Sequence, residues 1–151
     1  SGALPVTGPG VRVALSDAPA GQVVDPQFTV DDLVVHQQDL QAVINALWAG
    51  GAEAMTLQGQ RVTSLTAFRC VGNVLMLHGQ VYSPPYVVEA IGDPDQLSAA
   101  LAASEPIATY KQYVAAVGLG WDQQTSDELT FPAAASNSQL KYARAANPDQ
   151  L

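Results

Sequence analysis

Cysteine and basic side chains are the scarcest reactive groups in this 151-residue sequence. The single cysteine, Cys70, excludes an internal disulfide framework and any cysteine-rich zinc site. Six Lys and Arg stand against fourteen Asp and Glu, which gives a formal charge of -8, and no two of the cations are neighbours. Because binding to a phosphate backbone needs clustered cations, this composition argues against nucleic acid and against anionic lipid surfaces as partners.

Long apolar runs are also missing. A bilayer-spanning helix needs roughly 20 apolar residues, and the best run here, residues 42–49, is interrupted by Asn45. The sequence begins Ser1-Gly2-Ala3 without an initiating Met, which indicates an excised fragment with a cloning remnant at 1–3. Any membrane anchor or signal segment is therefore expected upstream of this fragment.

The residues that are present indicate one globular domain. Hydrophobic residues make up 48% of the chain and charged residues 13%, unlike a disordered segment. We expect an N-terminal segment at 1–10, a single domain at 11–132 and a low-complexity C-terminal tail at 133–151. The loop 16–29 is long for a compact domain, which indicates a mobile or functional segment.

Hydrophobic periodicity predicts both helices and strands. One helix follows from the apolar stripe Leu40, Val43, Ile44, Leu47 and Trp48, and the pair Gly50-Gly51 would end it. Two more helices are predicted to begin after Asp93 and Ser104, each followed by a proline within two residues.

Strands are predicted at 11–15, 54–57, 66–71, 74–77 and 86–91, and a terminal hairpin at 119–124 and 128–131 around the polar turn 125–127. This order predicts an α+β fold. Its antiparallel-rich sheet would be ferredoxin-like, with the helices packed on one face and extra hairpins added.

Several blocks resemble, in order, the bacterial family known as domain of unknown function 881. The longest block is VHQQDLQAVINALWAGGAEA at 35–54, and the others are TGPGV at 7–11, GQRV at 59–62, RCVG at 69–72, SPPYVVEAIGDP at 83–94 and LTFPA at 129–133. The resemblance covers residues 6–133, and within the family the sequence resembles an actinobacterial member. The loop 16–29 is longer than the resemblance leads us to expect, and the tail beyond Ala133 has no counterpart.

The resemblance implies a membrane-anchored bacterial protein with this domain outside the cytoplasm. Members carry an N-terminal membrane helix and a coiled-coil segment, and some are encoded among cell-division genes. It implies no activity. We therefore expect a non-enzymatic protein-interaction or scaffolding domain of the cell envelope or division apparatus, whose partner is another protein or a second copy of the chain.

Residues with catalytic or metal-binding chemistry do not form a recognisable set. Of the two histidines, His36 and His78, only His36 has a second ligand type nearby, Asp39, whereas a structural zinc normally takes four protein ligands. Cys70 follows Arg69, and a neighbouring cation favours the thiolate, but its apolar surroundings favour a core position. No serine lies in a Gly-x-Ser-x-Gly setting. We expect no enzyme, no cofactor and no metal.

A group of polar residues lies among apolar ones: Asn45, Arg61, Arg69 and Glu89. Because buried charges rarely go unpaired, Arg69 or Arg61 is predicted to pair with Glu89, and Asn45 to bind loop backbone, in a network that sets strand register. The alternative is an anion site, since guanidinium groups suit carboxylates. It would make the domain a sensor of a small anionic ligand or a cell-wall fragment.

A second cluster contains aromatic and proline residues: Tyr82, Pro84, Pro85 and Tyr86. It would form a rigid contact surface for a partner. The alternative is the start of an edge strand, where proline blocks unwanted pairing. The sequence leaves both interpretations open.

Overall fold

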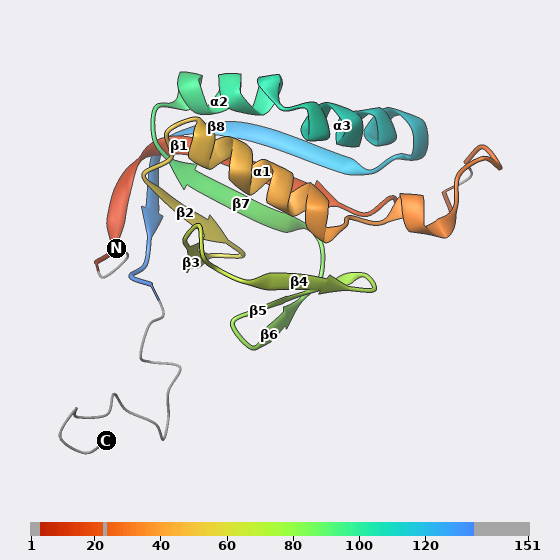
Figure 1. Ribbon diagram of the computed structural model, residues 1–151, viewed down its shortest axis with the longest axis horizontal. Coiled ribbons are helices and arrows are strands. Elements are labelled where there is room, and N and C mark those ends of the chain that lie inside the picture. The colour runs from red at the N-terminus through yellow and green to blue at the C-terminus, as the bar shows by residue number, and fades with distance from the viewer. Residues whose placement is uncertain (1–3, 23, 135–151) are drawn as a thin grey trace, which may run out of the picture.

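Three α-helices pack on one face of an antiparallel sheet in the computed structural model, which describes residues 4–22 and 24–134 (Figure 1). The helices are η1 (Val30–Leu33, one 3-10 turn), α1 (Gln37–Ala49), α2 (Pro94–Ala103) and α3 (Glu105–Val117). The strands are β1 (Val6–Ser16), β2 (Ala54–Leu57), β3 (Gln60–Val62), β4 (Phe68–Val71), β5 (Val74–Leu77), β6 (Gln80–Tyr82), β7 (Tyr86–Ile91) and β8 (Gly120–Phe131).

The main sheet has five strands in the order β3-β2-β7-β1-β8, all neighbours being antiparallel. Without β3, the chain order is strand, helix, two strands, helix pair, strand, and the first strand lies between the third and the fourth. This is the ferredoxin-like arrangement. The predicted fold class is confirmed, with β3 and a second sheet of three strands, β4-β5-β6, added between β2 and β7.

Local signals begin and end the helices where the sequence predicts. The Asp93 carboxylate accepts hydrogen bonds from the backbone N–H groups of Asp95 and Gln96 at 2.9 and 3.2 Å. The Ser104 hydroxyl accepts one from Ile107 N–H at 3.3 Å. These caps satisfy N–H groups that have no partner within the helix. Just after the C-terminal end of α1, Gly51 adopts a φ of 93°, a conformation that favours glycine.

The main core lies between the helices and the facing side of the sheet. Val11, Val13 and Leu15 alternate on β1 and are fully buried. The side chains that complete this core come from β2, β7 and the helices, and include Met55, Leu57, Tyr86, Val88, Leu40, Val43, Leu47, Leu97 and Ile107. Full burial of such an apolar side chain contributes about 1.5 to 3 kcal/mol, so apolar stripes hold the helices on this face.

A smaller apolar cluster covers part of the helix-free face of the sheet. It contains Ala54, Ile91 and Phe131, with Val6 and Leu129 packed beside them. The β1·β8 pairing shifts register between Gly8 and Gly10, and the two strands continue past this irregularity. We call residues 4–8 and 129–132, which contain these strand ends, the arm. The backbone of Gly10 approaches the Ala90 carbonyl too closely to leave room for a Cβ atom.

The small sheet has one buried face and one exposed face. Leu75 and Leu77 of β5 point into the main core. On the other face, Met76 lies directly opposite Arg69 of β4 and Val81 of β6. Met76 and Val81 are among the exposed large apolar side chains, and Val81 is 62% exposed.

Three predictions of strand boundaries were wrong. β1 begins at Val6, inside the segment 1–10, because its first residues pair with the end of β8, where Phe131 lies opposite Val6. Residues 120–131 form one continuous strand instead of a hairpin, since Thr125 pairs with Val11 and Gln124 with Arg12 on an exposed sheet edge that tolerates polar residues. β4 begins at Phe68, because Thr66 Oγ1 accepts a turn hydrogen bond from Thr63 N–H at 2.8 Å. From residue 135 onward the predicted tail lies outside the described residues.

Candidate functional site

An open groove lies between η1, the first half of α1 and α3, with a volume of about 890 Å³. Along α3 its wall is the stripe Pro106, Thr109, Tyr110 and Tyr113, which has the i, i+3, i+4, i+7 spacing of one helix face. The facing wall of α1 includes Gln37, Gln38, Gln41, Ala42 and Asn45. A second hollow, beside Trp48 and Phe68, is much smaller, at about 50 Å³.

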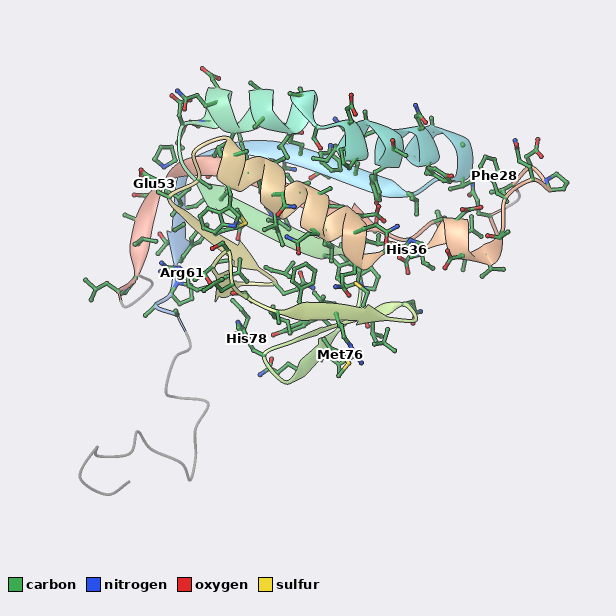
Figure 2. All side chains as sticks on the ribbon, viewed as in Figure 1. Phe28, His36, Glu53, Arg61, Met76 and His78 are labelled. Carbon is green, nitrogen blue, oxygen red and sulfur yellow. The ribbon has the colours of Figure 1, made fainter. Side chains whose placement is uncertain are left out.

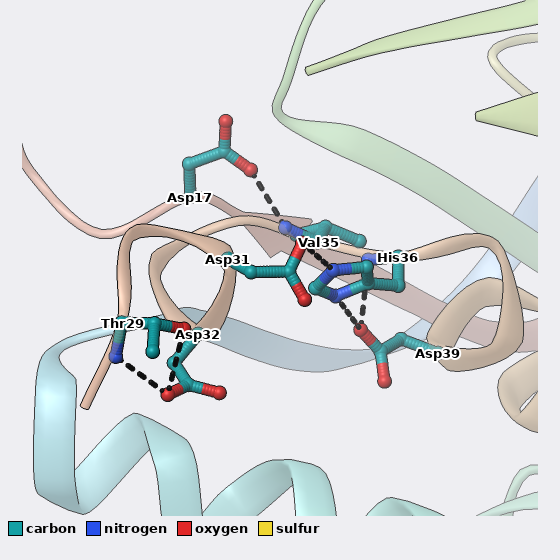
Figure 3. A network of polar contacts seen from close by, with 7 residues as sticks. All are labelled: Asp17, Thr29, Asp31, Asp32, Val35, His36 and Asp39. Carbon is teal, nitrogen blue, oxygen red and sulfur yellow. Dashed lines mark hydrogen bonds and ion pairs between the residues drawn. The ribbon is translucent and has the colours of Figure 1, made fainter. Parts of the chain in front are cut away.

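Carboxylates gather at the η1 end of this groove. Asp31, Asp32 and Asp39 line it together with His36. The imidazole of His36 lies between two of them: Nε2 is 2.9 Å from Oδ1 of Asp31, and Nδ1 is 3.7 Å from Oδ2 of Asp39 (Figure 3). The Asp31 side chain is 79% exposed and that of Asp39 only 20%.

Capping explains why these carboxylates lie where they do. Asp32 Oδ2 accepts a hydrogen bond from the N–H of Thr29 at 2.8 Å, at the start of η1. Asp39 Oδ2 accepts one from the N–H of His36 at 2.8 Å, at the start of α1. Both follow the capping-box pattern, in which a side chain three residues into the helix reaches back to the cap backbone. Asp17 fixes the segment between them by accepting from Val35 N–H at 2.9 Å.

Carboxylates dominate the electrostatics of the groove, and two of them contact the His36 imidazole. Burial raises the pKa of Asp39 above its ordinary value of 3.8, although the hydrogen bond from His36 N–H and the His36 charge act in the opposite direction. None of the lysine and arginine side chains in the described ranges lines the groove. A lysine or arginine that entered would meet carboxylates whose internal partner is the His36 imidazole, with no lysine or arginine of the described chain in its place.

The lining of the groove holds few of the side chains that commonly act as nucleophiles. Its only hydroxyl-bearing aliphatic side chain is Thr109, and neither serine nor cysteine lines it. Among the residues that the structure describes, no group of three or more His, Cys, Asp and Glu side chains is arranged to hold a metal ion. The His36–Asp31 pair therefore has no serine or cysteine to activate among the residues that line the groove.

Cys70 and His78 do not form a catalytic pair either. Burial raises the pKa of the Cys70 thiol, and the nearby Asp39 and Asp17 charges raise it further, which disfavours the thiolate. The thiol is half-buried and packs against the main core, as predicted. His78 occupies a turn, with a φ of 51°, and its Nε2 lies 3.5 Å from the Arg61 carbonyl.

The predicted pairing of Arg61 or Arg69 with Glu89 was wrong: the described residues contain no such ion pair. Arg61 and Glu89 both lie opposite Thr56, on either side of β2, so their backbones are about 10 Å apart. The Arg61 guanidinium instead donates to the carbonyls of Leu4 and Pro132 at 3.0 and 3.1 Å. Arg69 lies exposed on the small sheet.

Asn45 does not bind loop backbone as predicted. It is exposed on α1, and its Oδ1 accepts a hydrogen bond from Gln41 Nε2 at 2.8 Å. The i, i+4 spacing places the two side chains next to each other on the helix surface. Asn45 therefore belongs to the wall of the groove and not to the core.

The register reveals a polar row on the helix-free face that the sequence did not indicate. Directly opposite residues share a face of the sheet, and the row crosses all five strands as Arg61, Thr56, Glu89, Arg12 and Gln124. An Arg12 guanidinium nitrogen lies 4.0 Å from Asp122 Oδ2. Thr56 is 1% exposed, and its hydroxyl has no hydrogen-bond partner among the described residues.

The aromatic and proline cluster is not a continuous exposed strip. Tyr86 is buried in the main core, where its hydroxyl donates to the Asn73 carbonyl at 3.0 Å. Tyr82 is half-buried and shares hydrogen bonds with Gln60 and Gln80. The edge-strand interpretation was wrong, because β7 lies in the middle of the sheet; the prolines simply precede its first paired residue, Tyr86.

Figure 2 shows the separation of the predicted and the observed sites. His36 lies at the start of α1, whereas Arg61 lies at the opposite end of the molecule, next to the arm. The residues predicted to form one polar network thus lie apart. Of these, Asn45 alone lines the groove in the part of the chain that the structure describes. Asp31, Asp32 and the α3 stripe were missed, although the spacings Thr29-x-x-Asp32 and His36-x-x-Asp39 are readable signals of two successive helix starts.

Comparison with known proteins gives the family. A family described as "Bacterial protein of unknown function (DUF881)" matches residues 1–144. The chain belongs to this family. The resemblance of the sequence blocks is confirmed, and within the described residues no helix is long and apolar enough to cross a membrane.

Several relatives of this DUF881 domain are longer proteins, and the match covers only part of their length. A UPF0749 protein of Mycobacterium tuberculosis is 28% identical over 148 residues, which is 95% of this chain and 48% of that protein. The UPF0749 protein YlxW of Bacillus subtilis is 37% identical over 99 residues, 64% of this chain and 40% of that protein. The chain therefore spans about half the length, or less, of these curated relatives.

A solved structure shares the fold. The crystal structure of an uncharacterized conserved protein from Mycobacterium tuberculosis matches with a TM-score of 0.69 and 30% identity. The match covers 96% of this chain and 93% of that one. The two chains therefore share one fold over nearly their whole length.

Proposed function

We propose that this domain is a non-enzymatic protein-interaction module and that the groove between η1, α1 and α3 is its docking site. The supporting observation is the groove itself, about 890 Å³ in volume and flanked by one stripe from each of two helices. A surface of this kind suits a segment of another protein, which binds by laying side chains between the two helices. The groove residues offer no nucleophile that would make the site a covalent catalyst.

The walls of the groove support a docking role more than enclosure of a small molecule. Gln37, Gln38 and Gln41 line it and are solvent-exposed, as are Pro106 and Thr109 on the facing helix. Sites for small ligands bury most of the ligand surface and are mainly apolar. A wall of exposed amides is closer to the polar rim of a protein interface.

The arginines of the alternative anion site do not contribute to this groove. Arg61 is engaged by two backbone carbonyls, and Arg69 belongs to the small sheet. The groove carries carboxylates, which would repel an anionic ligand. A protein segment is therefore the occupant that the groove geometry favours.

The cellular setting belongs to the same proposal. The domain would lie outside the cytoplasm in a protein anchored by a single upstream membrane helix, and would act as a scaffold in the cell envelope or in cell division. The family resemblance supports this setting. Relatives about twice as long as the shared region leave space for further segments in those proteins.

Site-specific photo-cross-linking in cells tests the proposal. Cross-linking residues placed at Gln38 and at Thr109, on opposite walls of the groove, are expected to trap the same protein partner. The control is Gln124, which is exposed on the edge strand β8, on the helix-free face. The proposal fails if the two groove positions trap nothing in common, or if Gln124 traps the same partner with equal yield.

A further inference from the structure

We infer that the segment docking in this groove is cationic, carrying lysine or arginine side chains spaced along one face. The inference rests on the proposed docking function and names the chemistry of the partner. It follows from three features of the described residues: the charge of the groove, the position of the cations of the chain, and the composition of the facing wall.

The groove carries three carboxylates, and their partner among the basic side chains of the lining is the His36 imidazole. Asp31, Asp32 and Asp39 all line it, and the cap hydrogen bonds use only one oxygen each of Asp32 and Asp39. Asp31 contacts His36 alone and remains largely exposed. Carboxylate oxygens are left to accept charge-assisted hydrogen bonds from an ammonium or guanidinium group.

The described cations of the chain are positioned elsewhere. Arg12 approaches Asp122, and Arg61 is hydrogen-bonded to the arm. The ammonium group of Lys111 lies 4.8 Å from the ring centre of Trp121, away from the lining of the groove. A second copy of the chain would itself bring a formal charge of -8, so a cationic segment of a different protein complements the groove better.

The facing wall suits the rest of a long cationic side chain. Tyr110 and Tyr113 of α3 line the groove opposite the carboxylates, and Phe28 packs edge-on against Tyr113 with ring centres 6.0 Å apart. Lysine and arginine pack their apolar stems on such surfaces and keep the charged head at a polar partner. Tyr110 is only 4% exposed, so the ring that adds a cation–π attraction is that of Tyr113. The stripe of α3 and the carboxylates thus recognise two parts of the same side chain.

Selection of random peptides displayed on phage against the purified chain tests the inference. The selected peptides are expected to be rich in Lys and Arg, and to bind less tightly as salt concentration rises. Gln38→Lys is expected to weaken a selected peptide about three- to fivefold, and Gln38→Glu to strengthen it by a similar factor. Gln124→Lys makes the same change in net charge on the helix-free face and should leave the affinity unchanged.

A groove-filling variant separates the partner chemistry from the docking function. Thr109 is exposed on α3 and lines the groove, so Thr109→Trp should block binding without disturbing the core. If Thr109→Trp blocks binding but the selected peptides are neutral or acidic, or respond equally to both Gln38 variants, the cationic partner is refuted and the docking function stands. If no peptide is enriched, or if Thr109→Trp has no effect, the proposed function itself is contradicted.

Discussion

The two faces of the main sheet use their charged residues in opposite ways. On the helix-free face the guanidinium groups of Arg61 and Arg12 are engaged by carbonyls and by a carboxylate of the same chain. On the helix-covered side the groove between α1 and α3 holds carboxylates that face no lysine or arginine within the described residues. The first arrangement is structural, because its charges stabilise the fold; the second leaves charge available for a partner.

The difference shows why charged residues among apolar ones in a sequence are a weak guide to function. Arg61 stands beside a β-like run and holds the arm against the sheet. Asp31 stands in a segment without apolar periodicity and is exposed in the groove between η1, α1 and α3. Substitutions on the helix-free face should therefore change stability, and those in the groove should change binding.

A substitution in the apolar cluster on the helix-free face should have the largest effect on stability. Phe131 is 2% exposed and packs with Ala54 and Ile91. Phe131→Ala is expected to reduce the free energy of unfolding by about 3 to 5 kcal/mol, through lost burial and the cavity left behind. Urea denaturation measures the change, with Val81→Ala as a control expected within about 0.5 kcal/mol. Equal losses of stability in Phe131→Ala and Val81→Ala would mean that packing of the arm on this face does not stabilise the domain.

The two arginines predicted from the sequence to act together should differ in effect. Arg61→Ala removes two hydrogen bonds from a charged donor to the arm and is expected to cost about 1 to 2 kcal/mol, a reduced value because the site is half-exposed. Arg69→Ala, on an exposed strand, should be close to neutral. The same denaturation assay compares them, and a larger cost for Arg69→Ala would contradict the assignment.

The buried hydroxyl of Thr56 should be dispensable. It has no partner among the described residues, so Thr56→Val, which keeps the shape, is expected to stabilise the domain by about 1 kcal/mol. Thr7→Val provides a contrast of opposite sign, because the Thr7 hydroxyl donates to the Leu129 carbonyl at 2.9 Å. Loss of stability in Thr56→Val would show that the hydroxyl is engaged.

The smallest effect is expected at Asp39, in the groove. Asp39→Asn keeps an acceptor for the His36 N–H and should change stability by less than about 0.5 kcal/mol at neutral pH. Asp39→Ala removes the cap and should cost about 0.5 to 1 kcal/mol. Thermal unfolding distinguishes the two variants. An equal loss of stability in both would mean that the charge of Asp39, and not its cap hydrogen bond, stabilises the fold.

The raised pKa of Asp39 also gives a pH dependence with a definite sign. The folded chain holds the proton of Asp39 more tightly than the unfolded chain, so this contribution is fully present below 3.8 and is lost as pH rises through the raised pKa. Wild type should therefore gain stability relative to Asp39→Asn as pH falls through that window. A constant difference between the two proteins across the window would contradict the shift.

Much of the fold could be predicted because it depends on local patterns. The stripe from Leu40 to Trp48 and the caps at Asp93 and Ser104 specify helices within a few residues. The continuous β8 could not be predicted, since only pairing with β1 keeps Thr125 and Ser126 extended. The short β3 and β6 were missed for a similar reason.

The groove was beyond reach of sequence patterns because its walls come from distant segments. Tyr113 of α3 meets Phe28 and the η1 region only after the sheet has placed α1 beside α3. The ion pair with Glu89 was wrong because register, which the sequence did not reveal, inserts β2 between Arg61 and Glu89. Asn45 was recognised as unusual, but its exposure depends on the rotation of α1 about its axis.

Amide chemical-shift mapping tests the central claim most directly. A lysine- and arginine-bearing peptide is titrated into the isotopically labelled chain. The account predicts that the largest shifts fall at Asp31, His36, Gln38, Thr109 and Tyr113, and that they vanish in Thr109→Trp. Shifts centred on the exposed face of the small sheet, around Met76 and Val81, or on Glu89 and Gln124 of the helix-free face, would contradict it.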